Sequence, residues 1–198
     1  DVIIATPNKE IFDIVNFYNG IAIMTKFSHE SGSDRIFEAL EKYDKNKKYK
    51  IIINLQGDLP NINPLLINLT YKLLTEDSSA DISTLCSPIF NKREIENPNI
   101  VKAYIKNLVR PIYANDFVRI PGSYEHKKLF HHLGIYGYKR RSLKKFISLS
   151  QSPREKELKL EQLRALDNGM KIVIDFTDDI PIGVDTENDL NNIRKEFE

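Results

Sequence analysis

The stretch Ile51-Ile52-Ile53-Asn54-Leu55-Gln56-Gly57-Asp58-Leu59-Pro60 decides the fold expected for this chain. A continuous apolar run is typical of a buried parallel strand, and this one stops at a glycine, a carboxylate and a proline. Ligands of open α/β sheets bind beyond the carboxyl ends of the strands, so Asp58 is expected at the rim of such a site. Asp and Pro are also ordinary turn residues, so this segment alone is equally compatible with a simple turn.

Strand and helix patterns alternate on both sides of this segment. The pattern predicts strands over 2–5, 21–24 and 82–86, and helices over 8–17, 33–43 and 64–75. Ser33 is expected to cap the second of these helices, and Pro64 suits the first turn of the third. This rhythm predicts an α/β fold with a Rossmann-like, mostly parallel sheet flanked by helices.

Beyond Asn91 the rhythm changes. Short strands predicted at 101–105, 111–114 and 133–138, separated by polar loops, indicate a smaller antiparallel excursion or subdomain over about 100–140. Helices over 141–149, 153–168 and 187–197 and a strand over 171–176 complete what we interpret as a single domain, 1–198, with Gly169 ending the second of these helices.

Composition excludes several classes of function. The net charge of +1 comes from interspersed acidic and basic residues, so we expect neither nucleic-acid binding nor membrane-surface binding. Cys86 is the only cysteine, which excludes an intrachain disulfide and a cysteine-based zinc site and favours a cytoplasmic protein. No apolar run approaches the length of a membrane span, and no secretory signal is visible.

A second carboxylate, Asp185, has the same context as Asp58, because it follows an apolar stretch and precedes a helix. Two carboxylates from different strands that meet at one point are typical magnesium ligands, since Mg²⁺ takes one or two carboxylates together with phosphate oxygens and water. Asp185 or Thr186 could equally cap the last helix.

Three further segments carry polar residues of interest. The loop 29–35 leads into a helix, and the backbone N–H groups at the start of that helix suit a phosphate or a nucleobase edge. The loop could equally be a solvated capping segment. The sequence contains no GxGxxG or P-loop motif. Segment 131–138 has glycines within a strand, which allow close approach of a ligand, and hydrogen bonding of a polyhydroxylated ligand is favoured over metal binding. In 160–166 the leucines form a core stripe, which ordinarily leaves Glu161 and Gln162 on an exposed face.

Together and in this order, these segments resemble the cytidylyltransferases that activate the sugar acid Kdo, a branch of the Rossmann-like nucleotidyltransferase family. The resemblance spans nearly the whole chain, and HLGIYGY and LEQLR are specific to this branch. The matching segments are 31–35, 54–60, 98–102, 132–138, 160–164 and 183–186.

The resemblance implies a reaction in which CMP passes from CTP to Kdo, giving CMP-Kdo and pyrophosphate for lipopolysaccharide synthesis, with Mg²⁺ as cofactor and a homodimer as the assembly. It implies that Asp58 and Asp185 are catalytic and hold the metal. It implies that the cytidine nucleotide is contacted by Ser31, Arg35 and Gln56. By the same resemblance the sugar acid is held by His132, Tyr136, Glu161 and Gln162, with Arg119 as the candidate for its carboxylate.

Three departures from the family pattern bear on these expectations. The family's N-terminal strand and basic phosphate-binding loop do not occur in this sequence, the arginine expected to meet the sugar carboxylate is displaced, and Thr6-Pro7-Asn8 replaces a more acidic segment. Two alternatives therefore stay open. One is a cytidylyltransferase for another sugar acid, such as a sialic acid, and the other is a nucleotide-binding protein without catalysis.

Overall fold

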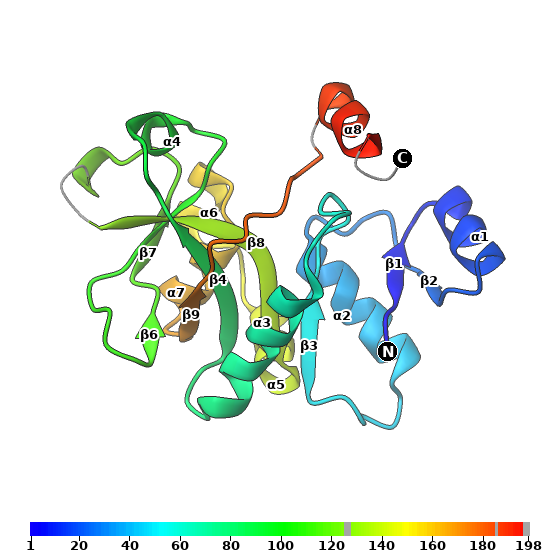
Figure 1. The fold of residues 1–198 in the computed structure, drawn as a ribbon. Helices are drawn as coiled ribbons and strands as arrows, with labels where there is room; N and C mark the ends of the chain where they lie inside the picture. The colour runs from blue at the N-terminus through cyan, green and yellow to red at the C-terminus, as the bar shows by residue number, and fades with distance from the viewer. Residues whose placement is uncertain (125–127, 185, 196–198) are drawn as a thin grey trace.

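The computed structural model describes residues 1–124, 128–184 and 186–195. A seven-stranded sheet with the order β6-β9-β4-β8-β5-β7, with β3 also paired to β8, forms the body of the protein (Figure 1). Its strands are β3 (Ile51–Asn54), β4 (Ile82–Pro88), β5 (Lys102–Tyr104), β6 (Ile112–Tyr113), β7 (Asp116–Val118), β8 (Leu129–Lys139) and β9 (Ile172–Phe176).

Most of the helices, though not α5 and α7, begin after a residue whose side chain caps them. Ser152, Asn8, Asn63 and Asn91 each accept a hydrogen bond from a backbone N–H of the helix that follows, and Pro64 occupies the first turn of α3 as predicted. The helices are α1 (Lys9–Phe17), α2 (Gly32–Tyr43), α3 (Pro64–Glu76), α4 (Lys92–Glu96), α5 (Arg140–Ser148), α6 (Pro153–Leu158), α7 (Gln162–Asp167) and α8 (Glu187–Arg194), and a 3₁₀ turn, η1, covers Gly122–Tyr124.

The long strand β8 organises the sheet. Its Tyr138 is paired with both Ile52 of β3 and Ile82 of β4, so these two strands lie on opposite edges of β8, and both are antiparallel to it. The α/β class and the antiparallel excursion are confirmed, but the sheet is mixed rather than mostly parallel. The successive strands β3 and β4 do run in one direction, yet the chain returns later in the sequence to insert β8 between them.

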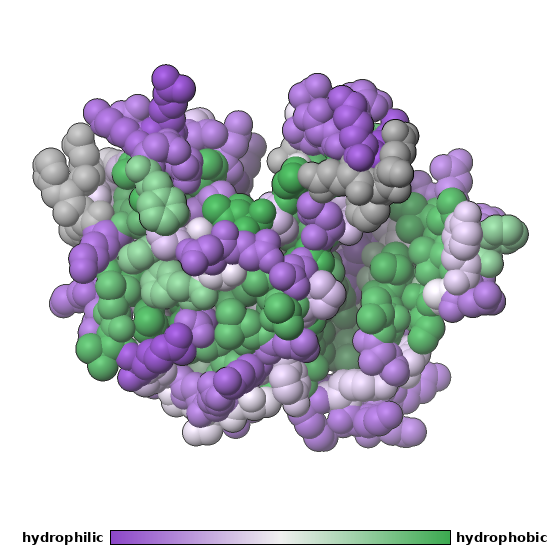
Figure 2. All heavy atoms as spheres, in the orientation of Figure 1, coloured by the Kyte–Doolittle hydropathy of each residue, from purple (hydrophilic) through white to green (hydrophobic). Residues whose placement is uncertain are grey.

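Strand β3 differs from the expectation in its burial. Ile51, Ile52 and Ile53 are only half-buried, because β3 pairs with β8 alone among the described strands and its other edge carries no strand. Nearby, β1 (Ile4–Thr6) and β2 (Ala22–Met24) form a separate two-stranded parallel sheet. Apolar side chains gather on the surface over β1 and α1, including Ile4, Ile11, Ile14 and Phe17 (Figure 2).

The core has one cluster on each face of the large sheet. Alternation along β9 sends Ile172 and Ile174 to one cluster and Val173 to the other. The first cluster packs the sheet against α2, α5 and α7, and the second packs it against α3. No helix among the described residues is long and apolar enough to cross a lipid bilayer.

Two local predictions are wrong. Ser31 rather than Ser33 caps α2, and Ser33 is buried in the first turn. The helix expected over 153–168 is two helices, α6 and α7, because Lys159 adopts the left-handed region with φ +53°. The leucine spacing continues through the break and conceals it, whereas Gly169, with φ +69°, follows the end of α7 as expected.

Candidate active site

The loop before α2 is held in place by its own polar side chains. Ser31 Oγ accepts a hydrogen bond from the Asp34 backbone N–H at 3.2 Å and donates one to Asp34 Oδ2 at 2.8 Å. Arg35 Nη1 donates to Thr25 Oγ1 at 2.8 Å and to the Lys26 carbonyl at 3.2 Å. Arg35 therefore fastens the loop to the end of β2, and its contact with a nucleotide stays a prediction.

The start of α2 meets the carboxyl end of β3. A Cβ atom at Gly32 would lie 3.2 Å from Gln56 Nε2 and 3.6 Å from Asn54 Nδ2, so any larger residue at this position would press on the Gln56 side chain. Ser31 and Gln56, both predicted to contact the nucleotide, therefore belong to one region, where the N-terminus of a helix offers backbone donors to an anion.

Asp58 lies just beyond this point, and it is exposed. Its carbonyl accepts a hydrogen bond from the Val184 N–H at 2.9 Å, which joins the turn after β3 to the segment after β9. Asp185, the second expected metal ligand, lies outside the described residues. Within the part of the chain that the structure describes, no group of three or more His, Cys, Asp or Glu side chains could hold a metal ion.

The predicted sugar residues on β8 lie together. The rings of His132 and Tyr136 have centroids 5.3 Å apart. Burial, with the nearby His131, lowers the pKa of His132 to about 3, so this imidazole is neutral at physiological pH.

Thr84 sets the tautomer of that imidazole. Its hydroxyl lies 3.0 Å from His132 Nε2 and donates its proton toward carbonyls, with the Ile135 oxygen at 2.8 Å. A hydroxyl has only one proton, so His132 Nε2–H must be the donor to Thr84 Oγ1. Nδ1 of His132 is thereby left as a hydrogen-bond acceptor.

Two residues that the sequence interpretation missed extend this cluster. Tyr138 OH lies 3.2 Å from Ser33 Oγ, which ties β8 to the first turn of α2. Burial raises the pKa of Tyr136 and of Tyr138, so both phenols keep their protons and can donate hydrogen bonds. The alternation of residues along β8 could have indicated Tyr138, whereas nothing in the sequence connects it with Ser33.

Glu161 completes the cluster from the turn between α6 and α7. Burial raises the pKa of its carboxyl, while the hydroxyls of Ser31 and Ser33 favour the charged form. Its Oε1 atom is buried and accepts no hydrogen bond from the described residues. An acceptor of this kind is suited to a hydroxyl group of a ligand.

Gln162 follows Glu161 as the first residue of α7 and is buried. The turn borders a pocket of about 380 Å³, lined by Glu30, Ser31, Gln151, Glu155, Lys156, Lys159 and Glu161.

The structure places Arg119 beside this turn. Its Nε donates to the Leu158 carbonyl at 3.1 Å, and Nη2 donates to the Lys159 carbonyl at 3.3 Å. Nη1 donates to the Pro98 carbonyl at 3.3 Å. Arg119 therefore binds the end of α6, and its role toward a sugar carboxylate stays a prediction.

The comparison with known families decides the membership of the chain. The model of the cytidylyltransferase family matches residues 1–172. The chain belongs to the cytidylyltransferase family.

Two relatives are similar in sequence to almost all of the chain. A 3-deoxy-manno-octulosonate cytidylyltransferase of Brucella ovis is 45% identical over 97% of this chain and 77% of its own length. The enzyme of the same name from Bartonella henselae is 43% identical over 98% of this chain and 80% of its own. Among solved structures, a CMP:2-keto-3-deoxy-manno-octonic acid synthetase complexed with CTP matches with a TM-score of 0.89 at 32% identity, covering 100% of this chain and 80% of that one.

Proposed function

We propose that this protein is a cytidylyltransferase that transfers CMP from CTP to Kdo (3-deoxy-manno-octulosonate) and releases pyrophosphate. The names of the relatives and the CTP complex of the similar structure support both substrates. The observation that carries the sugar side of the proposal is the buried Oε1 atom of Glu161, which has no donor among the described residues and lies in a cluster of groups suited to hydroxyls.

In the proposed reaction the anomeric hydroxyl of Kdo attacks the α-phosphorus of CTP. A phosphorus–oxygen bond forms to the sugar, the hydroxyl loses its proton, and the bond from the α-phosphorus to the bridging oxygen of pyrophosphate breaks. The contribution of the protein is to place the two substrates and to stabilise the developing charge.

The nucleotide is proposed to bind at the junction of α2 and β3. There Ser31 and Gln56 border the N-terminus of α2, and Gly32 gives the backbone room to approach. Arg35 supports this surface by holding the preceding loop, through its bonds to Thr25 and Lys26.

The sugar acid is proposed to bind over β8 and the turn before α7. His132 Nδ1 and Glu161 Oε1 would accept hydrogen bonds from sugar hydroxyls, and the Tyr136 phenol would donate one. Gln162 can both donate and accept. Replacing Gln162 by Ala is expected to weaken Kdo use more than CTP binding, and an equal loss of both would contradict its assignment to the sugar.

Magnesium is the proposed cofactor, with Asp58 and Asp185 as its ligands. The exposed carboxylate of Asp58, at the carboxyl end of β3, fits an ion that takes few protein ligands and completes its shell with phosphate oxygens and water. When bound, the ion would neutralise phosphate charge and lower the pKa of the attacking hydroxyl.

An assay of pyrophosphate release tests the proposal. The protein is expected to release pyrophosphate from CTP with Kdo and not with a sialic acid. Preference for the sialic acid would favour the alternative cytidylyltransferase. Binding of CTP without pyrophosphate release at any magnesium concentration would favour a nucleotide-binding protein without catalysis.

Three further proposals follow from the family. We propose a homodimer that uses the excursion over about 100–140, where Leu108, Val109 and Ile120 are exposed, and light scattering of the purified protein tests it. We propose a cytoplasmic location, consistent with the single buried thiol of Cys86, and a role in lipopolysaccharide synthesis. Accumulation of free Kdo in cells that lack the protein tests that role.

A further inference from the structure

The turn that carries Glu161 is short and depends on contacts from outside it. Lys159 adopts the left-handed region, and Gln162 is already in α7. The N–H of Leu160 donates to the Glu155 carbonyl at 3.3 Å, and the N–H of Arg164 donates to the Glu161 carbonyl at 3.1 Å. The position of Glu161 therefore follows from how α6 and α7 are held together.

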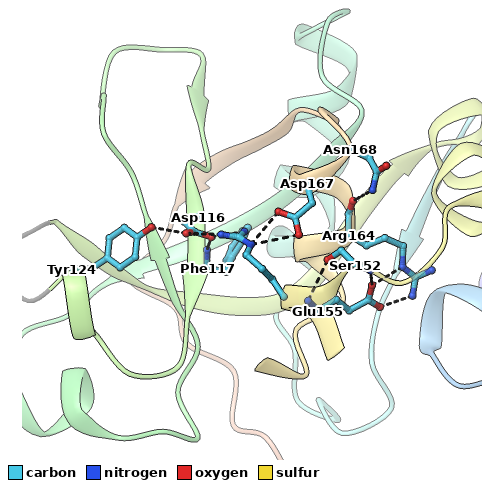
Figure 3. A network of polar contacts seen from close by, with 9 residues as sticks. Asp116, Phe117, Tyr124, Ser152, Glu155, Arg164, Asp167 and Asn168 are labelled. Atoms are coloured by element: carbon cyan, nitrogen blue, oxygen red, sulfur yellow. Dashed lines mark hydrogen bonds and ion pairs between the residues drawn. The ribbon is translucent and has the colours of Figure 1, made fainter. Parts of the chain in front are cut away.

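A buried ion pair joins the two helices behind the turn (Figure 3). Arg164 Nε donates to Glu155 Oε2 at 2.9 Å, and Arg164 Nη2 donates to Glu155 Oε1 at 2.5 Å. The side chains are only 4% and 6% exposed. The Arg164 guanidinium also lies 4.7 Å from the ring centre of Phe146 on α5.

The Glu155 carboxylate also caps the start of α6. Its Oε2 accepts the Ser152 N–H at 3.1 Å, and Ser152 Oγ accepts the Glu155 N–H at 3.2 Å, which forms a capping box at the start of α6. One carboxylate thus fixes the beginning of α6 and receives both bonds from α7. The pair has few degrees of freedom, because each partner is bound on two sides.

A second ion pair in the same helix pair provides a comparison. Arg154 donates to both carboxylate oxygens of Asp116 on β7, at 3.1 and 2.9 Å, and its Nε donates to Asp167 at 3.0 Å (Figure 3). The Arg154 side chain is 43% exposed. This pair joins the first turn of α6 to β7 and to Asp167, the last residue of α7, so it lies at the ends of the two helices away from the turn that carries Glu161. Neither Arg154 nor Asp167 borders the pocket beside Glu161.

We propose that Arg164 and Glu155 are positioning residues for the sugar acid, which act by holding the turn that carries Glu161 beside Ser31, with which Glu161 borders the pocket. This inference rests on the proposed function. Arg164 also lies close enough to Glu161 to favour its charged form, so it supports the hydrogen-bond acceptor electrostatically as well as geometrically. Ser31 and the rest of the nucleotide region are held by α2 and β3, with Ser31 bonded to Asp34 of α2, so CTP binding should not depend on this pair.

The experiment compares Arg164→Lys and Glu155→Gln with the matched control Arg154→Lys. Lysine keeps the charge of Arg164 but loses the paired geometry, and glutamine keeps one acceptor oxygen. We expect each of the first two variants to raise the KM for Kdo by about tenfold or more, because a small displacement of a binding group weakens its contact with the substrate. The KM for CTP and the dissociation constant of CTP measured by calorimetry should stay within about twofold of the wild-type values. A roughly tenfold increase in either would mean that CTP binding is impaired. Arg154→Lys should leave both KM values unchanged even where its melting temperature falls.

The possible outcomes separate the proposals. Equal increases in both KM values, unchanged Kdo kinetics in Arg164→Lys and Glu155→Gln, or the same loss in Arg154→Lys would overturn the positioning role. If Arg164→Lys does not fold, Glu155→Gln decides by the same criteria, with CTP binding as evidence of folding. Wild-type protein that releases pyrophosphate with another sugar acid and not with Kdo would overturn the proposed function, and this result would be seen without any substitution.

Discussion

Replacement of Glu161 by Gln gives the most direct test of the sugar site. The substitution keeps the size of the side chain but removes the charge, and it leaves the buried Oε1 position as a weaker acceptor. A hydrogen bond to a charged group contributes about 1.5–3 kcal/mol, so kcat/KM for Kdo is expected to fall by roughly 10- to 150-fold at neutral pH. CTP binding should not change.

The pH dependence of the same variant carries a second expectation. Burial raises the pKa of Glu161. As the pH falls, the wild-type carboxylate therefore takes up a proton, and stops being a charged acceptor, at a higher pH than an ordinary glutamate does. In Glu161→Gln this dependence of the KM for Kdo should disappear. The free energy of unfolding should also change: a carboxyl whose pKa is raised by folding destabilises the folded state once the pH exceeds its ordinary pKa, so Glu161→Gln should be more stable at neutral pH.

Pyrophosphate release at varied Kdo and CTP concentrations measures the kinetic effects, and urea unfolding measures the stability. Glu157→Gln is the matched control, because Glu157 is an exposed residue of α6. The assignment would be refuted by a Glu161→Gln enzyme with wild-type KM for Kdo, or by an equal loss for Kdo and CTP. A Glu157→Gln enzyme with the same defect would also refute it.

Three other predictions concern the nucleotide, the metal and the loop before α2. Asp58→Asn and Asp185→Asn should each abolish turnover with the fold intact, and near wild-type activity of either at limiting magnesium would contradict the metal assignment. Gly32→Ala should weaken CTP binding measured by calorimetry, because its Cβ would press on Gln56 Nε2 at 3.2 Å; unchanged CTP affinity would contradict the proposed contact. A hydrogen bond from the Lys26 N–H and then one from Lys42 lower the pKa of Glu38 to about 2, so its contribution to stability is present above pH 4.5 and is lost as the pH falls toward about 2. Urea unfolding should show a flatter profile in this range for Glu38→Gln, and an unchanged slope would argue against this contribution.

Several elements could be predicted from the sequence because their signals are local. The helices over 8–17 and 64–75 were predicted within a residue or two, since their caps, prolines and apolar spacing act within a few turns. The break between α6 and α7 was missed, because the Ser152-x-x-Glu155 signature of a capping box marks only the start of α6. The leucine spacing on both sides of Lys159 suits either one helix or two.

In the candidate site too, some features could be predicted from the sequence and others could not. Segment matches correctly selected the cytidylyltransferase family, as the family comparison and the relatives show. The residues that hold the site in place were not found in this way, because their partners are far away in the sequence. Ser33 and Tyr138 are an example, and so are the bonds by which Arg119, singled out from the sequence for a different role, donates to the end of α6.

By itself, the sequence determined the α/β class, the family and the identity of the polar residues after β3 and on β8, because these depend on short patterns of residue type. Only the tertiary structure decided that β8 inserts between β3 and β4, which makes the sheet mixed and leaves Ile51–Ile53 at an edge. It also decided that Glu161 faces the first turn of α2 instead of solvent. The physical reason is that strand order and buried polar contacts depend on the free energy of packing between segments far apart in the sequence. Short sequence patterns report only local preferences and do not predict that free energy.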